Sequence, residues 1–203
     1  MEKAFIILGP TSSGKTSLAI ELCKKYGGEI ISVDSRQIYK HMDIGTGKEP
    51  ITANFEVKKE DDCWIMDGVK IWGYDLIDPN QYFSAYDFAL FAIEKLKDII
   101  SRKKIPFLVG GTGFYFNVIT GEVELDKTPP DFSLREELEE LNTEELKQKL
   151  LKENPALAQK TDLNNPARMI RAIEKTVSEK QREPIKLPKN IEYKRIGLTA
   201  PRK

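Results

Sequence analysis

The chain has 203 residues, of which 32 are basic and 32 acidic, so it carries no formal net charge at pH 7. A chain of that length can bury a core large enough for one domain with an appendage. It has no apolar run near the roughly 18 residues of a membrane-spanning helix and no recognisable leader, so we expect neither a membrane protein nor a secreted one. The two cysteines, Cys23 and Cys63, are too isolated for a metal or redox site, and both fit a reducing cytoplasm.

Near the N-terminus, residues 9–16 read Gly-Pro-Thr-Ser-Ser-Gly-Lys-Thr, a complete G-x-x-x-x-G-K-[ST] phosphate-loop motif. The apolar run at residues 4–8 predicts a strand before it, and the apolar spacing from Leu18 predicts a helix after it. In that setting backbone N–H groups face a phosphate, Lys15 adds a positive charge, and Thr16 offers a hydroxyl to Mg²⁺. We therefore expect a di- or triphosphate to bind at Gly9, Pro10, Thr11, Ser12, Ser13, Gly14, Lys15 and Thr16.

Short apolar runs then alternate with helical patterns. Residues 29–33 and 105–109 read as buried strands, and residues 63–74 read as two strand pieces around the turn signal Asp67-Gly68. Ser84 is a candidate cap for a helix between these strands. Such alternation is typical of an α/β fold, in which helices flank a parallel sheet and ligands bind at the C-terminal ends of the strands.

From about residue 124 the pattern becomes helical. Residues 133–141 and 143–153 are charged and leucine-spaced, which predicts a small helical insert, and Asn165-Pro166 predicts the start of a further helix. Residues 183–203 contain several prolines and read as loosely structured. Acidic residues outnumber basic ones as far as residue 146, and the reverse holds beyond it, so the last part of the chain is a candidate polyanion-facing surface. Solvated lysines on surface helices explain the asymmetry equally well.

Two further motifs directly follow predicted strands. In Asp34-Ser35-Arg36-Gln37-Ile38-Tyr39 the carboxylate of Asp34 is placed to act as a general base or to bind Mg²⁺, although it could also be a simple loop cap. In Gly110-Gly111-Thr112-Gly113-Phe114-Tyr115 the glycines allow the backbone to approach a ligand closely, and Thr112 can hydrogen-bond it; the plain alternative is a flexible turn. Because parallel strands end at one edge of a sheet, we expect these motifs and the phosphate loop to converge.

Taken together, these motifs resemble those of the tRNA dimethylallyltransferases, also called tRNA isopentenyl transferases, from Ala4 onward. The matching stretches are GPTSSGKT (9–16), ISVDSRQIYKHMDIGTGK (31–48), LIDP with the following FSAYDF (76–88), VGGTGFY (109–115) and NPARMIRAIE (165–174). Many families share the phosphate loop, but DSRQIY followed by DIGTGK and GGTGFY is far more specific.

The resemblance implies a P-loop NTPase-like fold and the transfer of a dimethylallyl group from dimethylallyl diphosphate to the exocyclic amine of an adenosine beside the tRNA anticodon. It implies that Thr11 contacts the reacting region, that Lys15 and Thr16-bound Mg²⁺ stabilise the leaving diphosphate, and that Asp34 is the general base. The RNA contacts it implies are Asp34, Ser35, Arg36, Gln37, Thr112, Arg135, Arg168 and Arg171. Without the resemblance, the last two would read as part of an ordinary amphipathic surface helix.

The implied organisation is a P-loop core over residues 1–123, a tRNA-facing helical insert over 124–164, and a return helix with a C-terminal segment over 165–203. The family commonly has adjacent histidines where this chain reads Trp72-Gly73-Tyr74-Asp75, so their role is not carried over. A segment like residues 196–202 opens a further helical region in the family, so we expect this chain to be a shortened member.

Other classes of function remain open at this stage. A small-molecule or nucleoside kinase would use the same phosphate loop with ATP, but it would leave the motifs GGTGFY and NPARMIR unexplained. A prenyltransferase acting on free adenine nucleotides is a second alternative, against which the basic C-terminal part argues mildly. A non-enzymatic nucleotide- or RNA-binding module is a third. We expect a monomer located in the cytoplasm.

Overall fold

The computed structural model describes residues 2–49 and 56–199 and divides the chain into two compact units. The sheet unit comprises residues 1–125 and 185–203, and the helical unit comprises residues 126–184. No helix among the described residues is long and apolar enough to cross a lipid bilayer.

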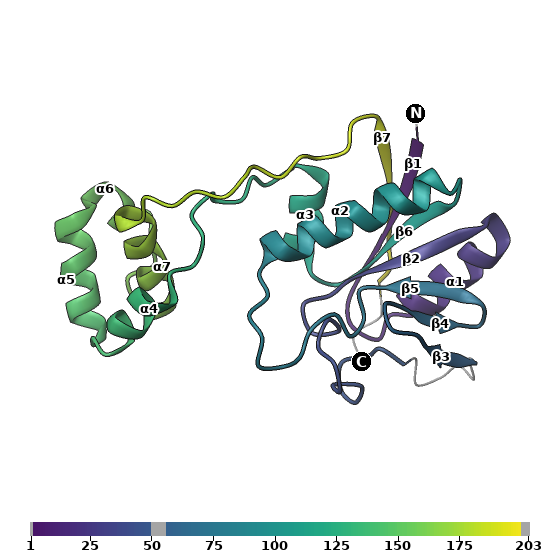
Figure 1. Ribbon diagram of the computed structural model, residues 1–203, viewed down its shortest axis with the longest axis horizontal. Coiled ribbons are helices and arrows are strands. Elements are labelled where there is room, and N and C mark those ends of the chain that lie inside the picture. Colours follow the sequence, from purple (N-terminus) through teal and green to yellow (C-terminus); the bar gives the residue numbers. More distant parts are fainter. Residues whose placement is uncertain (1, 50–55, 200–203) are drawn as a thin grey trace. The chain divides into compact units, whose positions relative to one another are not determined.

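The sheet unit is built on a seven-stranded sheet with the order β3-β4-β5-β2-β6-β1-β7 (Figure 1). Its strands are β1 Glu2–Leu8, β2 Gly28–Val33, β3 Val57–Lys59, β4 Trp64–Met66, β5 Val69–Trp72, β6 Ile105–Gly110 and β7 Ile191–Gly197. The strands from β5 to β7 run parallel, as the motif order predicts. Among the described strands, the antiparallel pairs are β3–β4 and β4–β5, at one end of the sheet. The β4–β5 turn lies at Asp67-Gly68, whose φ angles of 51° and 78° suit the predicted hairpin.

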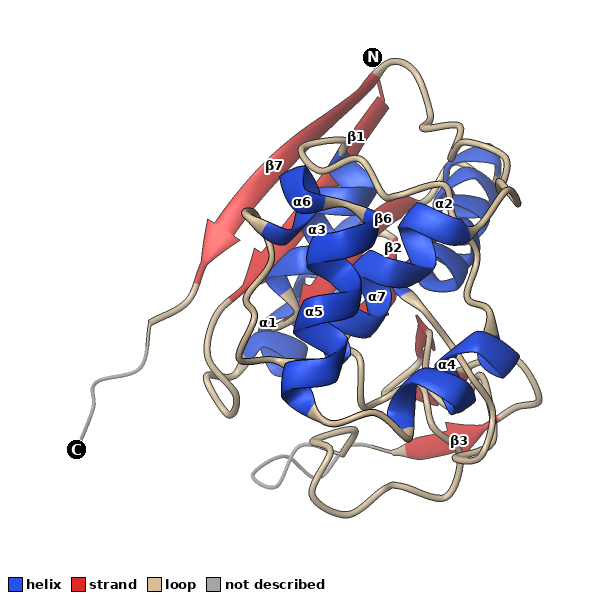
Figure 2. Ribbon diagram, turned by 90° about the vertical axis from the view of Figure 1, so that its left-hand side faces the viewer, coloured by secondary structure: helices blue, strands red, loops and turns tan. Residues whose placement is uncertain are grey.

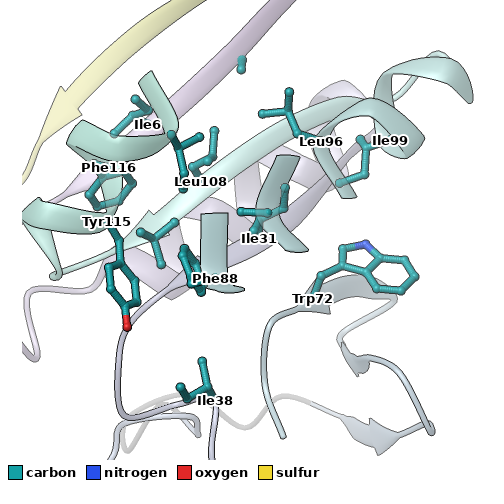
Figure 3. Packing of buried hydrophobic residues seen from close by; sticks show 14 of the residues in the cluster. Ile6, Ile31, Ile38, Trp72, Phe88, Leu96, Ile99, Leu108, Tyr115 and Phe116 are labelled. Carbon is teal, nitrogen blue, oxygen red and sulfur yellow. The ribbon is translucent and has the colours of Figure 1, made fainter. Parts of the chain in front are cut away.

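Helices cover both faces of this sheet (Figure 1). Helix α1 (Lys15–Tyr26) packs on one face, while α2 (Ala85–Ser101) and α3 (Gly113–Thr120) pack on the other. On the α2 side the Phe88 and Tyr115 rings stack with their centroids 4.4 Å apart (Figure 3). Ser84 caps α2 as predicted, in a reciprocal capping box with Asp87. Each face of the sheet thus has its own hydrophobic core, and the two cores fix the strand ends that carry the candidate motifs.

Strand β7 was not expected, because the sequence of residues 183–203 reads as loose. Within that range residues 191–197 pair in parallel with β1 along its whole length, from Glu2↔Ile191 to Leu8↔Gly197. The prediction is therefore wrong for this stretch. A strand whose pairing partner lies nearly two hundred residues away has no local turn or periodicity signal to reveal it. Residues 200–203 lie outside the described part of the chain.

The helical unit contains α4 (Phe132–Glu139), α5 (Thr143–Glu153), α6 (Pro155–Ala158) and α7 (Pro166–Val177), drawn in blue in Figure 2. Asn165 caps α7 and Pro166 is its first residue, as predicted. The predicted boundaries need correction, because α7 does not return to the sheet unit. Its buried face shares one core with α4, α5 and α6, formed by Leu138, Leu146, Leu150, Ala158, Met169, Ile170, Ala172 and Ile173. The insert therefore runs over residues 126–184.

A buried carboxylate at the start of β2 gives the sheet unit a specific acid sensitivity. Glu29 is 1% exposed and accepts hydrogen bonds from Arg102, Lys104 and Trp72 at 2.6–2.8 Å. Burial alone raises the pKa of Glu29, but these hydrogen bonds outweigh burial and hold that pKa at about 2. Because the folded-state pKa is depressed, the stabilisation is complete above the unfolded-state pKa of roughly 4.3 and is lost as the pH falls toward 2.

At pH 7 we expect Glu29→Gln to unfold at a lower urea concentration than the wild type. We expect the gap between the two urea midpoints to narrow as the pH falls from about 4.5 to 2. Tryptophan fluorescence is a suitable probe, because both tryptophans of the chain, Trp64 and Trp72, lie in the sheet unit. A gap that stayed constant across this range would show that the carboxylate charge contributes nothing.

Candidate active site

The phosphate loop connects β1 to α1 and has the conformation that the motif requires. Gly14 takes a left-handed conformation, with a φ angle of 82°, directly before the first residue of α1. Gly9 has no room for a side chain, because a Cβ atom there would lie 2.5 Å from the Leu198 carbonyl oxygen. The loop borders a cavity of about 300 Å³. That cavity is lined by Thr11, Ser12, Ser13, Gly14, Lys15, Thr16, Ser17, Ile30, Ser32, Asp34, Gln37, Thr46, Gly47, Glu49, Tyr74, Val109, Gly110 and Gly111.

Two side chains of the loop are suited to an anion. The Lys15 ammonium donates a hydrogen bond to the Pro10 carbonyl oxygen at 2.6 Å. Burial lowers the pKa of Lys15, and the negative charge of Asp34 opposes that shift. The Ser13 hydroxyl oxygen is buried without a hydrogen-bond partner. A buried polar atom without a partner is costly, and a phosphate oxygen would satisfy this one.

The three predicted motifs converge at one edge of the sheet. The backbone N–H of Ser35 donates to the Thr112 hydroxyl oxygen at 3.2 Å, which joins the loop after β2 to the loop after β6. The half-buried Asp34 accepts a hydrogen bond from the backbone N–H of Arg36 at 2.9 Å. Asp34 therefore lines the same cavity as Lys15, as the sequence predicts.

Some residues of the predicted motifs also have a structural task. Gln37 is 9% exposed, accepts a hydrogen bond from Ser32 at 2.6 Å and donates one to the Thr46 carbonyl at 3.0 Å. Its amide thus holds a neighbouring loop in place. Gly110 is required by the sheet rather than by a ligand, because a Cβ atom there would lie 2.0 Å from the Val33 carbonyl oxygen. Ser35 and Arg36 are exposed beside the cavity and remain free to meet a large substrate.

Sequence reasoning missed a buried ionic cluster behind the cavity. Lys48 is fully buried, and its ammonium contacts the Tyr39 carbonyl at 2.7 Å, Asp43 at 3.1 Å and Asp75 at 2.5 Å. Asp75 also accepts a hydrogen bond from the Trp64 indole at 2.7 Å. Lys48 ends the DIGTGK stretch, and Asp75 stands at the departure from the family pattern. Only their spatial proximity shows that they form a pair.

Tyr74, next to Asp75, is a second residue that was missed. Its hydroxyl donates to the Lys48 carbonyl oxygen at 3.3 Å. Burial raises the pKa of Tyr74 well above its ordinary value, so the phenol is neutral. Tyr74 thus lines the cavity and holds the backbone of Lys48.

Two of the predicted RNA-binding arginines are engaged inside the helical unit. Glu174 is fully buried, and Arg135 binds both of its carboxylate oxygens at 2.9 Å. Arg171 pairs with the same carboxylate and donates to the Thr128 carbonyl at 2.7 Å. The backbone N–H of Asp131 completes the cluster at 2.6 Å. These charge-assisted hydrogen bonds outweigh burial and lower the pKa of Glu174.

Arg168 differs from these two arginines. Its side chain is 68% exposed and has a loose ion pair with Asp162 at 3.6 Å. It lies with Lys160 and Lys175 along a shallow hollow of the helical unit. Arg171 lines the same hollow, but Arg168 is the most exposed of the three predicted arginines in this unit, which suits it to contact a polyanion.

A magnesium ion would fit at the phosphate loop if substrate phosphates and water supplied most of its ligands. Within the described residues, no three Asp, Glu, His or Cys side chains gather closely enough to hold a metal by themselves. Mg²⁺ commonly binds through one or two protein oxygens, substrate phosphates and water. The Thr16 hydroxyl and the Asp34 carboxylate, both lining the cavity, suit that mode of binding.

The sheet topology and the loop after β1 define an α/β protein of the P-loop class. A model of the family described as IPP transferase matches residues 37–203, and the chain belongs to that family. Its curated relatives include the tRNA dimethylallyltransferase of Acetivibrio thermocellus, which is 40% identical over an alignment of 212 positions. That alignment covers all of this chain and 64% of the relative. Another is the tRNA dimethylallyltransferase of Finegoldia magna, 42% identical over 85% of this chain and 52% of the relative.

Solved structures agree with this placement. The full-length tRNA isopentenylpyrophosphate transferase of Bacillus halodurans matches with a TM-score of 0.57 and 37% identity, over 98% of this chain and 60% of that one. A eukaryotic dimethylallyltransferase acting on tRNA matches with a TM-score of 0.71 and 25% identity, over 99% of this chain and 49% of that one. The chain thus spans less than two thirds of the length of these relatives.

Proposed function

We propose that this chain transfers a dimethylallyl group from dimethylallyl diphosphate to the exocyclic amine of the adenosine beside a tRNA anticodon. The observation that carries the proposal is that the phosphate loop and Asp34 line the same cavity, in a member of the IPP transferase family. The named activity of the relatives supports the choice of prenyl donor and tRNA acceptor. All the motifs come from one chain, so we propose a monomer, acting in the cytoplasm where mature tRNA is used.

Diphosphate is the leaving group of this reaction. As the bond between the donor carbon and the diphosphate oxygen breaks, negative charge grows on the phosphates. Lys15, the N–H groups of the loop and the Ser13 hydroxyl would stabilise this growing charge in the transition state more strongly than they stabilise the intact donor. Thr16 would hold Mg²⁺, which when bound adds further positive charge beside the phosphates. Thr11, in the same cavity, would contact the reacting carbon.

Asp34 is the proposed general base. The adenine amine attacks the donor carbon as diphosphate departs, and the proton that the nitrogen sheds passes to the Asp34 carboxylate. The Arg36 N–H already holds one of its oxygens, so the carboxylate is oriented before the substrate binds. An exocyclic amine is a poor nucleophile, and such fixed positioning contributes as much as base strength.

The acceptor adenosine must leave the anticodon stack to reach the cavity, at a cost of a few kcal/mol. Ser35 and Arg36, exposed beside Asp34, are the proposed contacts to the RNA near that adenosine, and Thr112 acts by fixing Ser35. In the helical unit we propose Arg168 as the phosphate contact. Gln37, Arg135 and Arg171 act indirectly, by holding the structures described above.

The decisive test is mass spectrometry of an adenosine-rich anticodon stem-loop after incubation with the protein and Mg²⁺. One sample contains dimethylallyl diphosphate and a parallel sample contains ATP. We expect the mass of one prenyl group to be added only in the first, and we expect Lys15→Ala to slow the addition by about 10²–10³-fold.

Lys25→Ala is a matched control, because Lys25 is an exposed lysine on the same helix. Transfer that survived Lys15→Ala at full rate would contradict the proposed diphosphate site. A phosphate gained from ATP would replace the proposal with a kinase.

A further inference from the structure

An exposed isoleucine lies on a loop beside the cavity. Ile44 is 99% exposed, and Met42 in the same loop is 42% exposed. We call residues 42–47 the rim loop, because Thr46 and Gly47 line the cavity together with Asp34. Single exposed apolar side chains are common on protein surfaces and by themselves indicate nothing. The position of this one, together with the way its loop is held, makes it informative.

The rim loop is held from both sides. The Thr46 hydroxyl donates to the Met42 carbonyl at 2.6 Å, and the buried Gln37 amide donates to the Thr46 carbonyl at 3.0 Å. Directly after the loop the buried Lys48 contacts Asp43, and the Lys59 ammonium contacts the other oxygen of Asp43 at 2.6 Å. A loop held in this way cannot fold over to bury its own apolar tip. Ile44 is therefore held in an exposed position on a loop whose later residues, Thr46 and Gly47, line the cavity.

The proposed reaction creates a partner for such a side chain. When an adenosine leaves a base stack, it leaves a gap between its neighbours, and proteins that unstack bases often place an apolar side chain such as Ile or Met between them. A rigid apolar tip avoids the entropy loss that a flexible side chain would suffer on insertion.

We propose that Ile44, supported by Met42, is a wedge that enters the anticodon loop and occupies the gap left by the acceptor adenosine. This rests on the proposed function, because it assumes an RNA whose target base is extruded. The role is that of a positioning residue, since Ile44 acts on the RNA neighbours of the reacting base and not on the reacting atoms.

Base extrusion can be followed without catalysis. A stem-loop with 2-aminopurine at the acceptor position fluoresces more strongly when that base unstacks, and the analogue lacks the amine that would react. At saturating RNA we expect a clear gain with the wild type, a similar gain with Ile44→Met, and a markedly smaller one with Ile44→Ala. Leu90→Ala is the control, because Leu90 is an exposed apolar residue at 46% on α2. An undiminished gain with Ile44→Ala, or no gain with the wild type, would overturn the wedge.

Transfer kinetics provide a second readout that a merely structural role would not produce. We expect Ile44→Ala to lower kcat/KM roughly tenfold on the stem-loop, where unstacking must be driven, and to have little effect on a short unstructured RNA that contains the same adenosine. An equal loss on both RNAs would overturn the wedge in favour of a general loop defect. A wild type that extrudes the base but transfers no prenyl group would refute the proposed function and leave the wedge standing.

Discussion

Replacing Asp34 by asparagine is expected to slow prenyl transfer by on the order of 10²–10⁴-fold, while diphosphate binding stays nearly unchanged. Asparagine keeps the size of the side chain and an oxygen that can accept the hydrogen bond from the Arg36 N–H, so the loop should keep its shape. What it lacks is the ability to accept a proton. Transfer is measured by product mass, and diphosphate binding by titration calorimetry in the same buffer.

Asp61→Asn removes an exposed carboxylate elsewhere in the sheet unit and serves as the control. If Asp34→Asn retained wild-type transfer, the proton would have to leave by another route and the role of Asp34 as base would be wrong. If it abolished diphosphate binding as well, the carboxylate would act mainly through Mg²⁺.

Glu174→Gln is expected to destabilise the helical unit by about 1–3 kcal/mol, because it removes the buried counter-charge that two partly exposed guanidinium groups share. Arg135 reaches this carboxylate from α4 and Arg171 from one turn before it on α7, so the loss affects the packing of both helices. Hydrogen exchange of the α7 amides measures local opening in the intact chain. This matters because a chain of two units has no single unfolding free energy.

Arg168→Ala is the matched variant, because it removes an arginine of the same helix that is exposed. It should leave the exchange of α7 unchanged and weaken RNA binding, with a salt-dependence slope lower by about one. Arg135→Ala should do the opposite and accelerate exchange. If Arg168→Ala bound RNA as the wild type does, the helical unit would meet the RNA elsewhere or not at all.

Features whose determinants lie close together along the chain were predictable from sequence. The phosphate loop, the Asp67-Gly68 hairpin, the Ser84 cap and the Asn165-Pro166 helix start each depend on a few adjacent residues, and all are found in the structure. The meeting of Ser35 with Thr112 was predictable for another reason, because the motifs end neighbouring parallel strands.

Features that depend on distant partners were missed or misread. Lys48 reads as one more surface lysine until Asp75 is placed against it, and nothing local shows that Arg135 and Arg171 share the buried carboxylate of Glu174. The motif could not show whether Gly110 serves a ligand or a strand, because the atom that excludes a side chain belongs to Val33. Side-chain charge is visible in a sequence, but the group that neutralises it is not.

The pairing of β1 with β7 also sets an order of assembly during protein synthesis. Leu8 lies on the strand that ends in the phosphate loop, and Leu198, whose N–H donates to the Leu8 carbonyl, is translated 190 residues later. At ribosomal speeds that separation is about 10–40 s. Throughout that interval the nascent sheet has an open edge along β1, and the Gly9 backbone lacks the neighbour against which it packs. The Gly9 end of the phosphate loop thus gains the neighbour that excludes a side chain from it only after Leu198 has been synthesised.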